Sequence, residues 1–183
     1  MTELAPSSSR TPAAPFIVTA ELPADVFAWA DGLRRAHYPA ERNWLAAHVT
    51  LFHSFAPSLR DELPRVLARL AAEFAPPMAT LSGLMPLGTG TALSIASPGM
   101  LNVRAHIAER FAGALTAQDQ HKPRLHITIQ NKVTSRAAKA LQRELEHGFE
   151  TRTFCFTGLA LHLYCNPHWE LQGRWRFRGK QGS

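Results

Sequence analysis

Two short segments, 47–53 and 125–132, constrain the fold of this chain most, because each alternates polar and apolar side chains around a histidine. Side chains alternate between the two faces of a β-strand. In the first segment His48 and Thr50 therefore share one face, and Val49 lies on the opposite, apolar face. The segment predicts a half-buried strand that places an imidazole and a hydroxyl side by side, about 7 Å apart.

The second segment repeats this pattern with different residues. His126 and Thr128 share one face, whereas Ile127 and Ile129 share the other. Each strand would bury its apolar face and leave its imidazole and hydroxyl accessible. We interpret the two segments as facing strands whose polar faces form one site.

An imidazole beside a hydroxyl suits proton transfer at a phosphoryl group. Histidine, with an ordinary pKa of about 6.5, can take or give a proton near neutral pH. A threonine hydroxyl can donate a hydrogen bond to a phosphoryl oxygen. In-line displacement at phosphorus needs a base on the entering side and an acid on the leaving side. Two such strands supply both, so we predict a site without metal and without cofactor, since no carboxylate cluster is evident in the sequence.

Either motif alone is explained as well by an ordinary half-buried strand with a wet face, because threonine is a common strand residue. The evidence for a functional site is that both motifs occur, in matching places of two similar halves. Strands are expected at 16–20, 47–55, 78–86, 91–96, 125–133, 153–164 and 169–177. Helices are expected from residue 23, over 58–74, from residue 98 or 99, and over 135–149.

This order of elements predicts an α+β fold with two similar lobes, each an antiparallel sheet flanked by helices, around a central cleft. We expect residues 1–15, which are rich in Ser, Thr, Ala and Pro, to form a flexible tail. Residues 16–183 would then form one bilobal domain.

The net charge and hydropathy of the chain limit the classes of partner that we expect it to bind. The 183 residues include 20 Lys and Arg against 14 Asp and Glu, a formal net charge of +6. A basic balance favours anionic partners such as nucleotides or RNA, but the excess is spread along the chain and also serves solubility. No apolar run of about 18 residues and no secretory pattern occurs. We therefore expect a cytoplasmic protein without membrane contact, for which a monomer suffices.

Two further residues share the histidine faces by alternation. Phe52 falls on the His48 face and could stack on a nucleobase; packing between the lobes is the alternative. Lys132 falls on the His126 face and could offer a cation to a phosphate. A solvated lysine at the strand end is the alternative for Lys132.

The two last strands carry other polar candidates. His162 and Tyr164 share a face and could line the cleft, although a polar sheet face is the commoner arrangement. By alternation, Arg174, Arg176 and Arg178 form a basic stripe that could follow an RNA backbone. Protection of an edge strand by charge is the commoner explanation. The opposite face would carry Trp169, Leu171, Trp175 and Phe177.

Segments 43–52 and 124–130 resemble the two signature motifs of the two-histidine (2H) phosphoesterases of the 2′-5′ RNA ligase family. Each has the pattern His-hydrophobic-Thr-hydrophobic, and the first segment also has the approach usual in that family. The order of strands and helices extends the resemblance over residues 16–178.

The resemblance implies a bilobal, pseudo-symmetric fold and metal-independent chemistry on 2′,3′-cyclic phosphates, 2′-5′ phosphodiester bonds or related nucleotides. It implies that His48 and His126 act as general acid and base, in an order that depends on the substrate. It also implies that Thr50 and Thr128 hold the phosphate. The expected substrate is therefore an RNA 3′ end or a small nucleotide.

One departure from the family's pattern bears on activity. Members close to the bacterial RNA ligase often carry an arginine shortly after the second threonine, where this chain has Gln130-Asn131-Lys132. Lysine is a point charge and cannot form the two-pronged contact of arginine with a phosphate. The departure favours the alternative hypothesis, a nucleotide- or RNA-binding protein with the same fold and no turnover.

Overall fold

The computed structural model describes residues 14–180. Apart from Ala14 and Pro15, the tail predicted at residues 1–15 lies outside the described residues, and so do the last three residues of the predicted domain. Within the described part, no helix is both long and apolar enough to cross a membrane.

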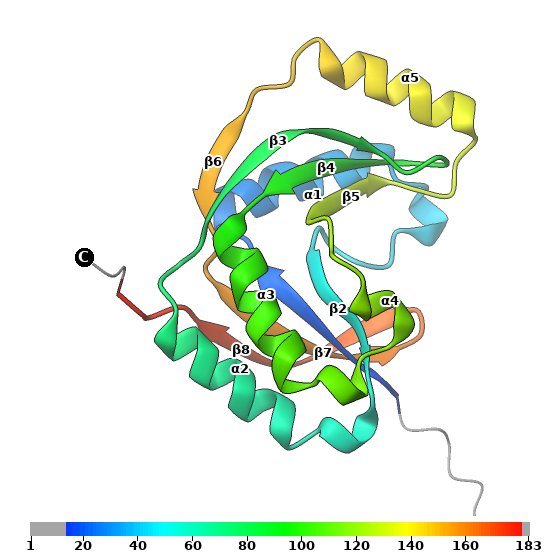
Figure 1. Cartoon of the computed structure of the whole chain (residues 1–183). Coiled ribbons are helices and arrows are strands. Elements are labelled where there is room, and N and C mark those ends of the chain that lie inside the picture. Colours follow the sequence, from blue (N-terminus) through cyan, green and yellow to red (C-terminus); the bar gives the residue numbers. More distant parts are fainter. Residues whose placement is uncertain (1–13, 181–183) are drawn as a thin grey trace, which may run out of the picture.

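Two four-stranded antiparallel sheets form the framework, which confirms the predicted α+β fold (Figure 1). Sheet A has the order β2-β1-β7-β8, and sheet B has the order β5-β4-β3-β6. The strands of sheet A are β2 (Val49–Phe55), β1 (Phe16–Glu21), β7 (Gly158–Cys165) and β8 (His168–Arg176). The strands of sheet B are β5 (His126–Gln130), β4 (Thr91–Ala96), β3 (Met78–Pro86) and β6 (Arg152–Cys155). The strand with the histidine motif thus lies at one edge of each sheet.

Within residues 14–180, five α-helices flank the sheets: α1 (Ala24–His37), α2 (Glu62–Glu73), α3 (Pro98–Arg110), α4 (Ala117–Gln120) and α5 (Ser135–Glu146). Short 3₁₀ turns occupy residues 40–42, 57–59 and 112–114. Side-chain hydrogen bonds cap the N-termini of two of these helices. Ser97 accepts a hydrogen bond from the backbone N–H of Met100 at the start of α3, and Thr134 does the same for Ala137 at the start of α5.

The first long helix of each half contacts the histidine strand of the other half. Helix α1 follows β1 of sheet A but packs on β5 of sheet B (Figure 1). Helix α3 packs on β3 of sheet B and also runs beside α2 (Figure 1). Its Arg104 donates to the carbonyl of Leu51 in β2, and Phe111 at its end contacts Phe55 of the same strand. Each histidine strand is therefore supported by a helix from the opposite half of the chain.

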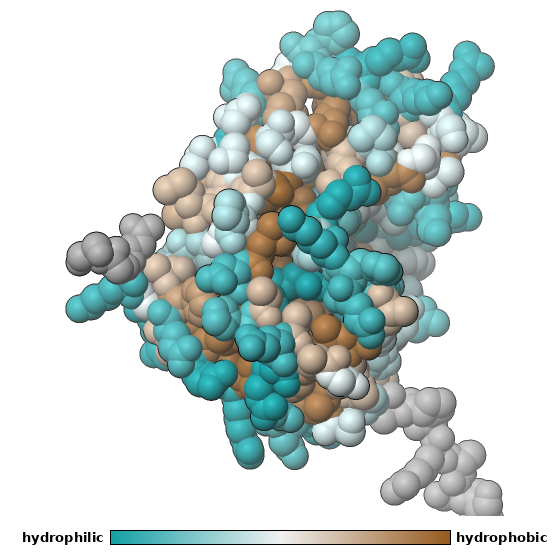
Figure 2. Space-filling view, in the orientation of Figure 1, coloured by the Kyte–Doolittle hydropathy of each residue, from teal (hydrophilic) through white to brown (hydrophobic). Residues whose placement is uncertain are grey.

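The apolar faces predicted for the histidine strands are buried in one continuous core. Val49, Leu51, Ile127 and Ile129 are all at most 1% exposed. Burial of these faces fixes which side of each strand remains accessible, because a shift of one residue would invert every side chain. In the view of Figure 2, hydrophilic side chains cover most of the surface, and apolar ones are visible where the two lobes meet.

Candidate active site

The first motif lies at the start of β2. His48 immediately precedes the strand, and both its side chain and that of Thr50 are half-buried. Thr50 pairs directly with Thr19 of β1, so the two threonines point to the same side of sheet A. Thr19 and His48 line a cavity of about 940 Å³, whereas Thr50 does not line it.

The second motif occupies the same place in sheet B. His126 is the first residue of β5, and both it and Thr128 are half-buried, while the intervening Ile127 is fully buried. Strands β2 and β5 contact each other where the two sheets meet. The two predicted motifs therefore lie on neighbouring edge strands, one from each sheet.

Both histidine rings are held by the same hydrogen bond. The Nδ1–H of His48 donates to the carbonyl of Ala46 at 2.7 Å, and that of His126 donates to the carbonyl of Arg124, also at 2.7 Å. A carbonyl oxygen can only accept, so Nδ1 must carry the proton in both rings. In each neutral imidazole this leaves Nε2 unprotonated and available to a reacting group.

Burial lowers the pKa of His48 to about 4, and this is the largest influence on the ring. The hydrogen bond to Ala46 works in the opposite direction. The positive charges of Arg34, His162 and His126 lower the pKa of His48 further. His48 is therefore a neutral imidazole over the physiological range, and both His126 and His162 are close enough for their charges to affect it.

Arg34 forms hydrogen bonds near both motifs and so connects them. The residue is 4% exposed. Its Nε donates to Asn43 Oδ1 at 2.7 Å and to the carbonyl of Leu45 at 2.8 Å, on the approach to the first motif. Its Nη1 donates to the carbonyl of Thr128, inside the second motif, at 2.8 Å. The guanidinium also lies over the ring of Tyr38, 4.2 Å from its centroid.

Arg104 makes the corresponding connection from α3, and it is 7% exposed. Its Nε donates to the carbonyl of Leu51 in β2 at 3.0 Å, and its Nη2 donates to the carbonyl of Asp119, before the second motif, at 2.6 Å. Its guanidinium lies 4.4 Å from the ring centroid of Phe52. No motif marks either arginine in the sequence, although each falls on the apolar stripe of its helix, where a charge must find buried partners.

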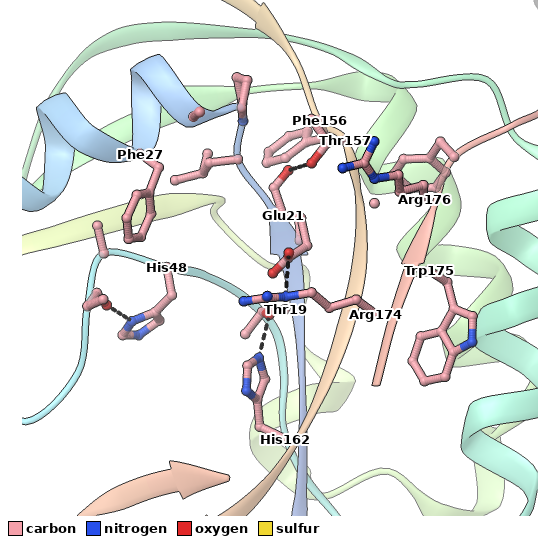
Figure 3. A pocket seen from close by; sticks show the side chains of 18 of the residues that line it. Thr19, Glu21, Phe27, His48, Phe156, Thr157, His162, Arg174, Trp175 and Arg176 are labelled. Atoms are coloured by element: carbon pink, nitrogen blue, oxygen red, sulfur yellow. Dashed lines mark hydrogen bonds and ion pairs between the residues drawn. The ribbon is translucent and has the colours of Figure 1, made fainter. Parts of the chain in front are cut away.

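Sheet A forms one wall of the cavity beside His48 (Figure 3). Trp169 of β8 packs on His48, with ring centroids 4.7 Å apart, and on His162, with centroids 5.5 Å apart. Arg174 crosses the wall to Glu21, with Nε 2.9 Å from the carboxylate. Sequence reasoning missed Trp169 and Glu21 as site residues, and no motif marked either of them.

His162 and Tyr164 have different positions, although both lie on β7. His162 lines the cavity, and its Nε2 is 3.0 Å from Thr19 Oγ1. Burial, followed by the charge of Arg174, lowers the pKa of His162 to about 4. Tyr164 is 38% exposed, donates a hydrogen bond to Asn166 Oδ1 and does not line the cavity.

The predicted position of Phe52 on the histidine face is wrong. Val18 of β1 pairs with Phe52, and its neighbour Thr19 pairs with Thr50, so Leu51 is an extra residue in β2. Alternation shifts by one after this irregularity, and Phe52 turns into the core, where it is 0% exposed. A base cannot stack on a ring that has no accessible face.

The predicted position of Lys132 on the histidine face is also wrong. Strand β5 ends at Gln130, so alternation no longer applies at Lys132. Lys132 is exposed in a turn with φ of 60°, and its N–H is bonded to Asn131 Oδ1. The four strand steps from His126 to Gln130 alone span about 13 Å, which separates Lys132 from the second histidine.

The last strand contains a second irregularity. Leu161 pairs with Gly173, but its neighbour His162 pairs with Leu171, so Gln172 is an extra residue. Trp169 and Leu171 therefore share a face with Arg174 and Arg176, contrary to the expected division into an aromatic and a basic face. Both arginines line the cavity together with Trp169.

Among residues 14–180, no group of three or more His, Cys, Asp or Glu side chains could hold a metal ion. The chemistry that this site can offer comes from two imidazoles with free Nε2 atoms, threonine hydroxyls and the arginines of the sheet A wall.

Comparison with solved structures places this fold among known ones. A protein of Thermus thermophilus matches with a TM-score of 0.64 and 18% identity, over 91% of this chain and 100% of that one. E. coli LigT complexed with NADP⁺ matches with a TM-score of 0.61 and 16% identity, over 91% and 99%. A structure described as a phosphoesterase matches with a TM-score of 0.58 and 17% identity, over 90% and 98%.

No curated protein sequence matches the chain. A sequence profile of the 2′-5′ RNA ligase superfamily matches residues 22–166, a span that includes both histidine motifs and most of the described fold. The protein therefore belongs to the 2′-5′ RNA ligase superfamily.

Proposed function

We propose that the protein is a metal-independent phosphoesterase that opens 2′,3′-cyclic phosphates of RNA ends or nucleotides, or cleaves 2′-5′ phosphodiester bonds. The single observation that carries the proposal is the matching state of the two histidines. In each motif Nδ1 is bonded to the carbonyl two residues earlier, so Nε2 is the reactive atom on both sides. Strands β2 and β5 contact each other, so the two Nε2 atoms would supply the base and the acid that an in-line displacement requires.

The lowered pKa of His48 favours this residue as the general base in the proposed hydrolysis. Its Nε2 would take a proton from water as the water oxygen bonds to phosphorus. The bond from phosphorus to the leaving ribose oxygen would break, and the Nε2–H of protonated His126 would give its proton to that oxygen. Thr50 and Thr128 would donate hydrogen bonds to the remaining phosphoryl oxygens, since each lies two residues after its histidine.

Crystal structures of a relative support a nucleotide substrate. E. coli LigT has been crystallised with 3′-AMP, with ATP and with NADP⁺. All three ligands combine a phosphate with a nucleobase, a combination that also suits the arginines and aromatic rings around His48.

The direct test is hydrolysis of a short RNA that ends in a 2′,3′-cyclic phosphate, followed by phosphorus NMR in excess EDTA. We expect ring opening to proceed at the same rate with and without EDTA, because two protein side chains move both protons. A rate that EDTA abolishes and Mg²⁺ or Zn²⁺ restores would contradict the proposal.

The pH dependence tests the role of His48. We expect kcat/KM to rise with pH through about 4 and then level off, because kcat/KM reports the free enzyme and its base must be unprotonated. Activity should fall again at higher pH, when the general acid loses its proton. An acidic limb near the ordinary histidine pKa of about 6.5 would exclude His48 as the base.

A second candidate is a nucleotide-binding protein without turnover. The position of Lys132 favours it, since β5 ends at Gln130 and the lysine lies in an exposed turn beyond the second motif. This candidate predicts that wild type binds the RNA end without opening it, and that His48→Ala binds equally well.

A further inference from the structure

The peptide group between Ala46 and Ala47 is hydrogen-bonded at both ends. Its carbonyl, on Ala46, accepts from the Nδ1–H of His48 at 2.7 Å (Figure 3). Its N–H, on Ala47, donates to Oδ1 of Asp31 at 2.8 Å, and this second bond is buried. A peptide group is planar, so the direction of its N–H fixes the direction of its C=O. The carboxylate at one end therefore aims the carbonyl that orients the His48 ring.

Asp31 supplies an acceptor that the sheet does not provide. Ala47 lies in the irregular segment before β2 and is 6% exposed, and a buried N–H needs an acceptor. Asp31 reaches it from α1, where its own side chain is also buried. Asp31 does not line the cavity beside His48. It therefore acts on the ring through the peptide and not through contact with a ligand.

The second histidine is held without such a carboxylate. The Nδ1–H of His126 donates to the carbonyl of Arg124, which belongs to the peptide between Arg124 and Leu125. The carbonyl of Leu125 accepts from the N–H of Ile95, so pairing with β4 orients this approach. Within the described residues, no Asp or Glu side chain accepts from the N–H of Leu125. Of the two motifs, only the first depends on a carboxylate from a distant helix.

We propose that Asp31 is a positioning residue for His48, because through the Ala46–Ala47 peptide it holds the imidazole as the tautomer with its proton on Nδ1. The hydrogen bonds of a histidine ring determine which nitrogen is protonated. Without Asp31 the peptide would be free to rotate, and the ring could place its proton on Nε2 instead. A neutral ring with Nε2–H cannot accept a proton there. This inference rests on the proposed function, in which Nε2 of His48 is the base.

The direct test is nitrogen NMR of histidine-labelled protein near neutral pH, where His48 is uncharged. Protonated and unprotonated ring nitrogens resonate far apart, and the His48 signals are those missing from the spectrum of His48→Ala. We expect wild type to show a single His48 tautomer with the proton on Nδ1. In Asp31→Ala we expect a second His48 tautomer with the proton on Nε2, whereas His126 should keep its tautomer in both proteins.

Kinetics with the cyclic-phosphate RNA measure the consequence for catalysis. An acidic residue that bonds a catalytic imidazole directly contributes about 10⁴-fold to kcat. Asp31 acts through one peptide group, so we expect the smaller loss of about tenfold in kcat for Asp31→Ala, with KM unchanged. Asp31→Asn keeps an oxygen acceptor for the Ala47 N–H. It should show the single tautomer and restore kcat to within about threefold of wild type, since only the charge assistance is lost.

Arg35→Met is the matched control. Arg35 pairs with the other carboxylate oxygen of Asp31, so its loss leaves the bond to Ala47 in place. It should change neither the His48 tautomer nor kcat. If Asp31→Ala does not fold, Asp31→Ser takes its place with the same expected results, because a water molecule can then satisfy the buried N–H.

A purely structural role for Asp31 predicts a different outcome. Asp31→Ala would then melt at a lower temperature, but its folded form would keep the wild-type tautomer and kcat. That result would overturn the proposal, and so would equal losses of kcat in Asp31→Asn and Asp31→Ala.

The two measurements also separate failure of this inference from failure of the proposed function. If wild type does not open the cyclic phosphate, the proposed function fails, but the NMR spectra still report on Asp31. A second His48 tautomer in Asp31→Ala would support the positioning role, and an unchanged tautomer would contradict it.

Discussion

Alanine at His48 or at His126 is expected to lower kcat for cyclic phosphate opening by roughly 10²–10⁴-fold, the usual contribution of a positioned acid or base. Each substitution removes the Nε2 atom that would transfer a proton. Because the two groups act in one step, the double variant should lose much less than the product of the single losses. Single-turnover kinetics with the cyclic-phosphate RNA measures the effect.

His147→Ala provides a close control for these variants. The Nδ1 of His147 is bonded to the carbonyl of Arg143 at 2.6 Å, so the ring is held in the same way, but on the exposed end of α5. We expect this variant to keep wild-type turnover. The melting temperatures of all three variants should stay close to that of wild type. If His48→Ala or His126→Ala folds and retains near-wild-type kcat, the paired acid-base mechanism is wrong.

Methionine at Arg34 or at Arg104 is expected to lower the free energy of unfolding by about 3 kcal/mol, because buried carbonyl groups would lose their donors. Methionine keeps much of the length of the side chain, so the effect reports the lost guanidinium more than a lost stem. For a chain of this size the melting temperature should fall by about 6–12 °C. Urea unfolding followed by circular dichroism measures both variants.

Arg35→Met is the matched control on the same helix. Arg35 is 69% exposed and pairs with Asp31 one turn away at 3.3 Å, an interaction expected to contribute less than about 1 kcal/mol. Arg34→Lys should restore only part of the lost stability, because one ammonium group cannot reproduce the fork that Asn43, Leu45 and Thr128 share. An Arg34→Met protein as stable as wild type would show that the connection contributes nothing.

Patterns within single strands predicted most of the fold and the core of the candidate site. Alternation placed Val49 and Ile127 in the core and their neighbouring histidines on the accessible face, since both stretches are regular. The prediction failed where a strand gains a residue, as at Leu51, or ends early, as before Lys132. These irregularities depend on how neighbouring strands pair. They cannot be predicted from the alternation within a single strand.

The contributions of distant segments were harder to predict. Glu21 and Arg174 meet only because β1 and β8 flank β7 in the same sheet. Arg34 and Arg104 gave a local signal, a charge on an apolar helical stripe, but one acceptor of each, Thr128 and Leu51, lies in the opposite half of the chain. The sequence could have marked the two arginines as buried, but it could not have named their partners.

Because α1 and α3 each contact the histidine strand of the other half, neither half of the chain is complete without the other. A break in the turn between β3 and β4 would separate two halves of similar size, each with one histidine strand. Neither fragment would carry the helices that contact its own histidine strand, because α1 packs on β5, and both α4 and Arg104 of α3 contact β2. Each fragment alone would expose the apolar side of its histidine strand to water. Mixed together, the two would be complementary pieces, and the candidate site would form only in their complex.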